Sequence, residues 1–240
     1  MYSWLATHQI AHRGLFSRGT ECEENTLAAI IAAVDAGYGC EMDVRITGDH
    51  QIVVFHDATL DRLTSASGAI DEISYSVLQT IHVGASGQPM PLLSAVLSAI
   101  KGRRALIIEI KTEGTTDLEA LGRALLSVLE PYSGHFAVMS FDPRIILWFK
   151  KNAEHVCRGM VLEIKGHDMP AEMDRHRLLC DETDADFISH DIRTLPTDFT
   201  QRWREAGKPV LCWTVRTPED EAKALQYTDA MTFEPPAVTG

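Results

Sequence analysis

Residues 40–57, CEMDVRITGDHQIVVFHD, decide how the chain folds. They contain two β-rich runs, 40–44 and 52–56, and the turn between these runs is too short for the crossover that parallel strands require. We therefore predict an antiparallel hairpin. If the pairing is centred on the turn, Glu41 lies roughly opposite His56, so that two ionisable side chains meet at one level.

The rest of the sequence alternates short β-rich runs with helical segments marked by capping residues and first-turn prolines. The predicted strands are 9–12, 40–44, 52–56, 105–111, 136–140, 159–162, 186–189, 210–214 and 230–233. The predicted helices are 26–36 with Asn25 before it, 92–101, 117–130, and four more that begin at Asp142, near Met169, at Thr197 and at Thr217. This alternation indicates a parallel sheet covered by helices. Because the hairpin accounts for one strand beyond the eight of a closed barrel, we predict a TIM-type (β/α)8 barrel.

The composition is that of one globular domain, which we assign to residues 1–240. Hydrophobic residues make up 45% of the 240 residues, which allows a sizeable core. No linker, low-complexity tract or internal repeat divides the sequence. Residues 57–90 are longer than a usual strand-to-helix connection, so we predict a small insertion there that could cover the active site.

The net charge and the distribution of apolar residues limit the kinds of partner that this protein can bind. A net charge of -12 argues against nucleic acid and against stable association with an anionic membrane. Residues 1–10 lack the features of a signal peptide, and no run approaches the length of a membrane span, so we expect a cytoplasmic protein. The five cysteines are scattered singly, which predicts reduced thiols rather than a disulfide framework or a cysteine metal site. The oligomeric state is left open.

Ionisable residues cluster at the ends of four predicted strands. The clusters are His12-Arg13-Gly14, Glu41-x-Asp43, His56-Asp57 and Glu109-x-Lys111. The carboxyl ends of barrel strands form the active-site face, and residues two apart on a strand share one side. We therefore expect these side chains to meet at one mouth of the barrel.

Three of the clustered residues are acids whose convergence predicts a metal site. Unpaired, the carboxylates of Glu41, Asp43 and Glu109 would repel one another, and a divalent cation would resolve the conflict. Ligands that are all oxygen favour Mg²⁺ or Ca²⁺ over zinc. Structural salt bridges, such as Glu109 with Arg13 or Lys111 with Asp43, are the alternative interpretation.

The other clustered residues suit phosphodiester cleavage. His12 and His56 could take a proton from the nucleophile and give one to the leaving alkoxide. Arg13 and Lys111 would face the phosphate. Trp213, late in a predicted strand, either walls the pocket against the alcohol part of a substrate or belongs to the core.

Taken in order, the motifs resemble those of the glycerophosphodiester phosphodiesterase family. They are IAHRG at 10–14, ENT at 24–26, EMDV at 41–44, VVFHD at 53–57, LDRLT at 60–64, EIK at 109–111, SFD at 140–142 and WTV at 213–215. The resemblance covers roughly residues 10–235. It departs from the family pattern at Arg216, where the family commonly has Asn, and at Thr232-Phe233-Glu234-Pro235, where the family has Thr-Asp before its final proline. The charge of Arg216 and the bulk of Phe233 would change substrate preference.

The resemblance implies a β/α barrel with an insertion after the second catalytic histidine. It also implies hydrolysis of a glycerophosphodiester to glycerol 3-phosphate and an alcohol, with His12 and His56 as the acid/base pair. The metal ligands it implies are Glu41, Asp43 and Glu109. Two alternatives stay open: a cyclising phospholipase D-like lyase, and a non-catalytic protein that binds phosphoesters on the same fold.

Overall fold

The computed structural model describes residues 3–6, 9–165 and 168–235. Contacts divide the chain into two compact units, one of residues 11–136 and one of residues 1–10 and 137–240. The boundaries fall within strand β1 (Gln9–Ala11) and strand β5 (Phe136–Ser140).

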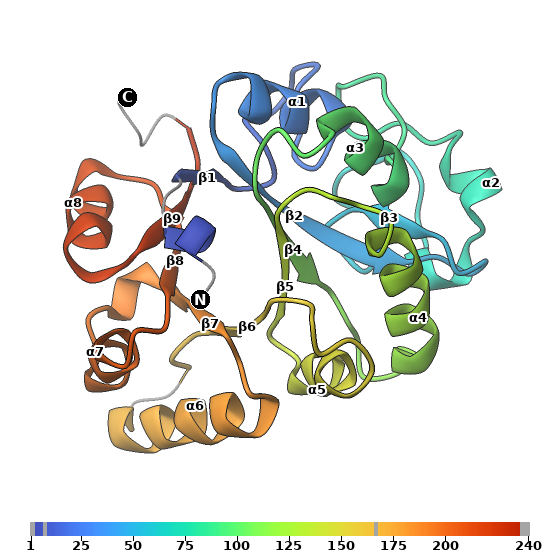
Figure 1. Cartoon of the computed structure of the whole chain (residues 1–240). Coiled ribbons are helices and arrows are strands. Elements are labelled where there is room, and N and C mark those ends of the chain that lie inside the picture. Colours follow the sequence, from blue (N-terminus) through green and yellow to red (C-terminus); the bar gives the residue numbers. More distant parts are fainter. Residues whose placement is uncertain (1–2, 7–8, 166–167, 236–240) are drawn as a thin grey trace. The chain divides into compact units, whose positions relative to one another are not determined.

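The unit of residues 11–136 contains a small sheet with helices beside it. Its elements are α1 (Leu27–Asp35), β2 (Gly39–Ile46), β3 (Ile52–Val54), the 3-10 helix η2 (Ile70–Glu72), α2 (Tyr75–Leu78), α3 (Leu93–Ile100), β4 (Leu106–Ile110) and α4 (Leu118–Leu129). β2 pairs in parallel with β4 and antiparallel with β3. Helices α1 and α3 lie side by side, and α1 and α4 contact β2 (Figure 1). All five residues of β4 are buried, as expected of a strand covered on both faces.

The hairpin of β2 and β3 forms as predicted, but its register differs by one residue. Val44 pairs with Val54 and Ile46 pairs with Ile52, so continuing this register would put Met42 opposite His56. The expected pairing of Glu41 with His56 is therefore wrong. A slip of one residue moves every side chain to the other face of a strand, so the turn must be placed to within one residue.

Helix α1 also begins one residue later than predicted. Thr26 is the capping residue, because its side chain accepts a hydrogen bond from the backbone N–H of Ala29. Asn25 instead has a left-handed backbone, with φ of 60°, and its amide turns toward the sheet. The sequence pattern did not separate these roles, since both residue types are good helix caps.

Residues 57–90 build an apolar cluster of their own against β3. Buried side chains from the insertion pack with two from the hairpin strand, and the cluster comprises Val53, Phe55, Leu60, Ile70, Leu78, Val83 and Met90. Short bridges, such as the one between Thr59 and Ala69, tie the segment together. The predicted internal structure of this long connection is thus present, although its exact boundaries stay a prediction.

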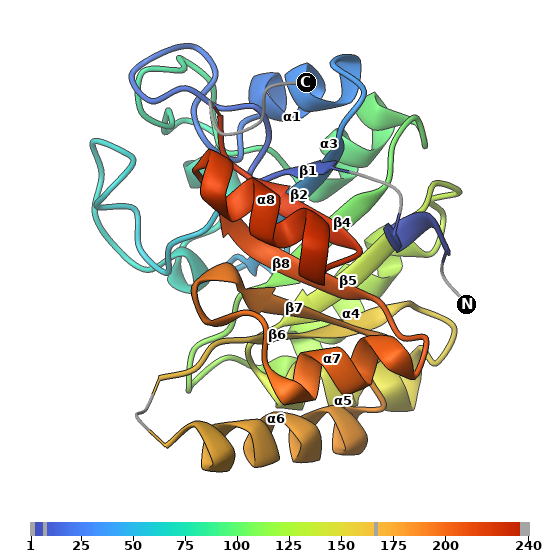
Figure 2. The same cartoon turned by 90° about the vertical axis from the view of Figure 1, so that its left-hand side faces the viewer.

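The unit of residues 1–10 and 137–240 is a layer of parallel strands with helices packed against it. Its elements are η1 (Ser3–Ala6), α5 (Pro143–Asn152), β6 (Arg158–Leu162), α6 (Met169–Thr183), β7 (Phe187–Asp191), η3 (Ile192–Thr194), α7 (Asp198–Glu205), β8 (Val210–Val215), α8 (Pro218–Tyr227) and β9 (Ala230–Phe233). Strands β5 to β9 pair in parallel and in sequence order. Figure 2 shows α7 and α8 in front of the strands of this layer.

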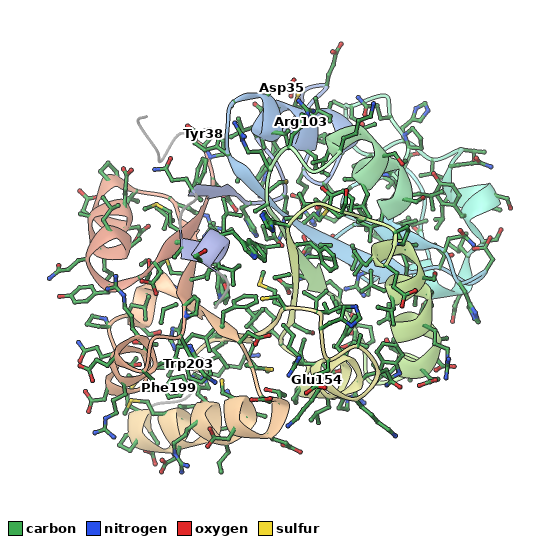
Figure 3. The ribbon with its side chains drawn as sticks, viewed as in Figure 1. Asp35, Tyr38, Arg103, Glu154, Phe199 and Trp203 are labelled. Atoms are coloured by element: carbon green, nitrogen blue, oxygen red, sulfur yellow. The ribbon has the colours of Figure 1, made fainter. Side chains whose placement is uncertain are left out.

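Capping explains where the helices of this unit begin. Each of α5 to α8 follows a residue whose side chain accepts a backbone N–H, and these residues are Asp142, Asp168, Thr197 and Thr217. Two aromatic side chains of α7 lie close together: Phe199 and Trp203 have ring centroids 5.7 Å apart (Figure 3). The predicted helix starts are confirmed here.

Within the unit of residues 11–136 the strand order is β4-β2-β3, and within the other unit strands β5 to β9 are neighbours in sequence order. With β3 set aside as the second strand of the hairpin, these parallel strands alternating with helices are those of a TIM-type (β/α)8 barrel. The fold prediction is confirmed, whereas the assignment of residues 1–240 to one domain stays a prediction. Across the described part of the chain, no helix combines the length and the apolar character needed to cross a membrane.

Candidate active site

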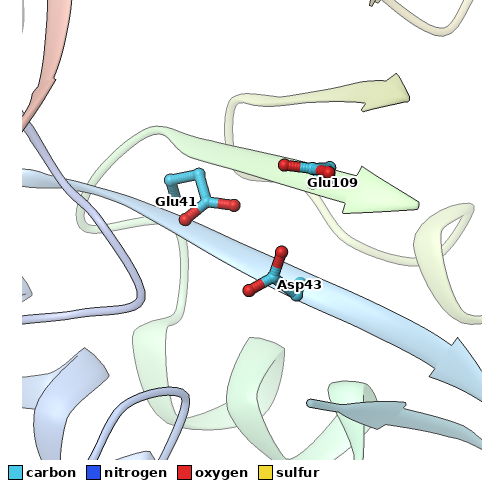
Figure 4. Close-up of side chains that lie close together, drawn as sticks. All are labelled: Glu41, Asp43 and Glu109. Atoms are coloured by element: carbon cyan, nitrogen blue, oxygen red, sulfur yellow. The ribbon is translucent and has the colours of Figure 1, made fainter. Parts of the chain in front are cut away.

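Three acidic side chains meet on neighbouring strands. Glu41 and Asp43 lie two residues apart on β2, and Glu109 lies on β4 directly opposite Asp43. Figure 4 shows the three carboxylates close together. One oxygen from each lies within 4.8 Å of the others, and all three residues are buried. The structure therefore brings together the acids that the strand pattern had placed on one side.

Two cationic side chains lie among these acids. Lys111 Nζ is 3.0 Å from Asp43 Oδ1, and it donates a hydrogen bond to Glu109 Oε1. Arg13 Nε lies 3.2 Å from Asp43 Oδ2, while Arg13 Nη1 donates to Glu24 Oε1 at 2.6 Å. The salt bridge between Lys111 and Asp43, considered above as an alternative to a metal site, is present.

These cations do not satisfy Glu41. Its Oε2 accepts a hydrogen bond from the backbone N–H of Arg13 at 3.1 Å, but its buried Oε1 has no hydrogen-bond partner among the described residues. Burial, followed by the charges of Asp43 and Glu109, raises the pKa of Glu41 well above its usual range. A hard divalent cation would bind such an oxygen and offset the repulsion, so the three acids fit a metal ion of this kind.

The other two acids differ in their electrostatic environment. Burial disfavours the charged form of Asp43, but Lys111 and Arg13 outweigh burial and hold the pKa of this carboxyl well below its usual range. Burial also raises the pKa of Glu109, and Lys111 offsets that effect only in part. Asp43 is therefore firmly ionised, whereas Glu41 and Glu109 lose their protons less readily.

The turn after β1 presents His12 and Arg13. His12 Nε2 is 3.8 Å from Glu41 Oε2. Arg13 has a left-handed backbone, with φ of 56°, which is uncommon for a residue other than glycine and typical of functional turns. Gly14 follows with φ of 85°, and a Cβ there would lie 2.5 Å from the backbone carbon of Ala29. Only glycine allows this close approach to helix α1.

His56 follows β3 and is held by its neighbour in sequence. The Nδ1 atom of His56 lies 2.6 Å from Asp57 Oδ1. Burial lowers the pKa of His56, and the negative charge of Asp43 opposes that shift. The imidazole is therefore close electrostatically to Asp43, rather than to Glu41 as the expected hairpin register implied. A histidine with a lowered pKa is mainly neutral at pH 7 and can accept a proton.

Two residues of the site were not assigned a role from the sequence. Asn25 donates its amide to Asp43 Oδ2 at 2.9 Å and accepts the backbone N–H of Asp43 at 3.2 Å. Glu24, buried beside it, bonds Arg13 and Arg62. The run of two acids and an amide at residues 23–25, just before a helix, was the available signal, but it was interpreted only as a cap and a family motif.

A family comparison agrees with this geometry. The model of the glycerophosphoryl diester phosphodiesterase family matches residues 12–231. The chain belongs to this family. Membership identifies it as an enzyme that cleaves phosphodiesters, and the match begins at His12 and spans all the acids and cations described above.

Relatives within the family support the assignment over different lengths. The glycerophosphodiester phosphodiesterase of Caldanaerobacter subterraneus subsp. tengcongensis is 30% identical over 169 residues, which is 66% of this chain and 68% of that protein. Glycerophosphodiester phosphodiesterase 1 of Bos taurus is 24% identical over 252 residues, which covers 89% of this chain and 73% of that protein.

A solved structure of another phosphodiesterase has the same fold. A phosphodiesterase of Oleispira antarctica, in complex with the product sn-glycerol-3-phosphate, matches with a TM-score of 0.83 at 24% identity. The match covers 97% of this chain and 94% of that one.

The departures from the family pattern lie in the unit of residues 1–10 and 137–240. Arg216 does not present a free charge, because its guanidinium donates to both carboxylate oxygens of Glu234, at 2.8 and 2.9 Å. Phe233 is buried. Trp213 is partly buried, donates its indole N–H to the carbonyl of Ser189 at 3.1 Å and meets the ring of Phe141 edge-on. Its role as a substrate wall stays a prediction.

Proposed function

We propose that the chain hydrolyses glycerophosphodiesters to glycerol 3-phosphate and an alcohol, with the help of one divalent cation, Mg²⁺ or Ca²⁺. The observation that carries this proposal is the buried Oε1 of Glu41, which has no hydrogen-bond partner in the part of the chain that the structure describes and lies close to two further acids. The ligands would be Glu41, Asp43 and Glu109. Bound there, the cation would act as a Lewis acid toward the phosphate and would lower the pKa of the attacking water or hydroxyl.

The side chains around the acids suit the remaining chemical tasks. Arg13 would bind phosphate oxygens by forked hydrogen bonds, and Lys111 would add a point charge. His12 and His56 would divide the proton transfers: one takes the proton of the nucleophile and the other protonates the departing alkoxide. Trp213 would contact the alcohol portion. The glycerol 3-phosphate in the Oleispira antarctica structure supports a small phosphoester as the ligand.

The nucleophile is either water or a neighbouring hydroxyl of the substrate. Attack by that hydroxyl would release a cyclic phosphate, as in the cyclising phospholipase D-like lyases. A cyclic product that accumulates would therefore favour a lyase, and direct formation of glycerol 3-phosphate favours hydrolysis. Family membership favours an enzyme over the non-catalytic alternative.

A release assay tests the proposal. The purified chain is given glycerophosphocholine, glycerophosphoethanolamine, glycerophosphoglycerol or bis(4-nitrophenyl) phosphate, each with and without EDTA. We expect glycerol 3-phosphate from at least one natural diester, loss of activity in chelator, and recovery with Mg²⁺ or Ca²⁺. Activity that is unchanged in chelator would refute the metal-dependent mechanism. A cytoplasmic location is likewise a proposal, which cell fractionation would test.

A further inference from the structure

Arg62, in the insertion, lies between two carboxylates that face it from different segments. Its Nη1 and Nη2 atoms donate to both oxygens of Glu24, at 3.0 and 2.7 Å. Its Nε and Nη2 atoms donate to both oxygens of Asp57, at 2.5 and 3.0 Å. The guanidinium thus makes two forked pairs at once, which a lysine ammonium has no geometry to reproduce.

Each of these carboxylates continues to a residue of the candidate active site. Glu24 Oε1 also accepts a hydrogen bond from Arg13 Nη1 at 2.6 Å. Asp57 Oδ1 also lies 2.6 Å from Nδ1 of His56. An unbroken series of ion pairs and hydrogen bonds therefore runs from Arg13 through Glu24, Arg62 and Asp57 to His56.

The positive and negative charges in this series balance one another. The contacts also constrain the side chains at its two ends, Arg13 and His56. Glu24 is buried, and Arg62 and Arg13 lower its pKa against the effect of burial. Without Arg62, Glu24 would keep Arg13 as its charged partner and compete with the phosphate for that guanidinium. Asp57 would lose the contacts that fix its carboxylate. That carboxylate would then no longer hold Nδ1 of His56 in the orientation that leaves Nε2 for proton transfer.

A second contact holds the insertion in place independently of Arg62. Glu23 Oε1 accepts the backbone N–H of Gly19 at 2.7 Å and that of Ala85 at 3.5 Å. A Cβ on Gly84, where φ is +52°, would lie 2.7 Å from the same carboxylate oxygen. The insertion therefore meets the loop after β1 at two places, so removing Arg62 leaves the Glu23 contact in place.

We propose that Arg62 is a positioning residue, which couples the phosphate-binding Arg13 to the proton-transferring His56 through the carboxylates of Glu24 and Asp57. This inference rests on the proposed function. It assigns the insertion a part in catalysis: the insertion supplies the cation that sets the geometry of two groups on other segments of the same unit.

The test compares Arg62→Ala and Arg62→Lys with Arg103→Ala. Arg103 is a matched control, because it is also about half exposed and also forms an ion pair, with Asp35 at 2.6 Å (Figure 3). For each protein, kcat, KM and Tm are measured on the best natural diester and on bis(4-nitrophenyl) phosphate. A second series of assays on the alanine variant includes guanidinium chloride, with an equal concentration of NaCl as the salt control.

We expect Arg62→Ala to lower kcat about 10²-fold, because misplacement of reacting groups by about 1 Å has that effect. KM should change much less than kcat. Arg62→Lys should recover only part of the loss, guanidinium should restore kcat in the alanine variant, and Arg103→Ala should keep the wild-type kcat. If Arg62 had only a structural role, Arg62→Ala would have a lower Tm, its kcat would not fall selectively relative to KM, and guanidinium would not restore kcat.

The outcomes separate the two proposals. A wild type that cleaves no diester would refute the proposed function and this inference with it. An active wild type together with wild-type kcat in Arg62→Ala would overturn the inference alone, as would a loss of kcat that guanidinium leaves unchanged. If Arg62→Ala does not fold, Arg62→Lys decides: reduced kcat at normal Tm supports the coupling, and normal kcat overturns it.

Discussion

Asp43 and Glu109 stand directly opposite each other on the parallel strands β2 and β4. Parallel strands place such a pair at one level, so two buried acids are forced into proximity by the sheet itself. Lys111 bonds both of them, which leaves Glu41 as the acid whose charge is least compensated.

Glu41→Gln should separate cation binding from folding. In the wild type, Mg²⁺ at 100 times its Kd should stabilise the fold by about 2.7 kcal/mol, and Tm should rise accordingly. In Glu41→Gln that rise should nearly vanish, while Tm in chelator should increase because a repelling buried charge is gone. Thermal unfolding with EDTA and with Mg²⁺ measures both. The exposed Glu130→Gln is the control, and an unaltered Mg²⁺ response in Glu41→Gln would contradict the ligand assignment.

Replacing either imidazole should abolish most turnover. His12→Ala and His56→Ala should each lower kcat about 10²-fold or more, since each removes a positioned proton-transfer group. His155 is exposed, so His155→Ala should keep normal rates and serves as the control. Steady-state assays at pH 7 decide the matter. Near-normal rates in both active-site variants would exclude the acid/base roles.

Asn25→Gly should weaken cation binding without straining the backbone. Glycine accepts the left-handed conformation at this position, so the variant removes only the amide that orients Asp43. Loss of such a contact to a metal ligand typically lowers affinity about 10- to 100-fold. Titration of Mg²⁺ against activity measures the shift, with Asn152→Gly as a comparison at a helix end. An unchanged Mg²⁺ dependence would show that Asp43 is oriented without the amide.

A buried histidine pair predicts lower stability in acid. His176 and His190 are both buried, with ring centroids 5.5 Å apart. Burial, with His190 and Arg175 adding to it, lowers the pKa of His176 to about 4. An unfolded histidine has a pKa of about 6.5, so the unfolded chain binds more protons between these values. The contribution of His176 to stability is therefore complete above pH 6.5 and is lost as the pH falls toward 4.

Unfolding by urea between pH 7.5 and pH 4.5 tests this. The wild type should lose at most about 3 kcal/mol of its free energy of unfolding through His176 over that range. His176→Phe should flatten the dependence, whereas a replacement of the exposed His155, His155→Gln, should leave it as steep as in the wild type. Equal slopes for wild type and His176→Phe would assign the acid sensitivity to other groups.

Much of the fold followed from short-range signals. Strands 136–140 and 230–233 match the structure residue for residue, and Thr197 and Thr217 cap helices where predicted. Such features depend on neighbours in sequence, which the amino-acid pattern records directly.

The missed features depend on contacts between distant segments. The hairpin register was one residue off because the pattern near the turn allows two pairings. Asn25 looked like a helix cap, and only the fold shows that its amide reaches Asp43, 18 positions away. Arg62 bonds Glu24 across 38 positions, a partnership that no local spacing indicates. The ionisable groups of the candidate site were therefore visible in the sequence, whereas the residues that contact and orient them were not.

Val53 and Phe55 belong to the same apolar cluster as Leu60 and Met90 of the insertion. The strand segment that leads to His56 and the insertion that follows His56 therefore pack in one apolar cluster. A chimera that exchanged residues 57–90 for the equivalent stretch of a relative would have to exchange the hairpin strand as well. In the evolution of this chain, insertion and hairpin strand are accordingly expected to change together, as one inherited block.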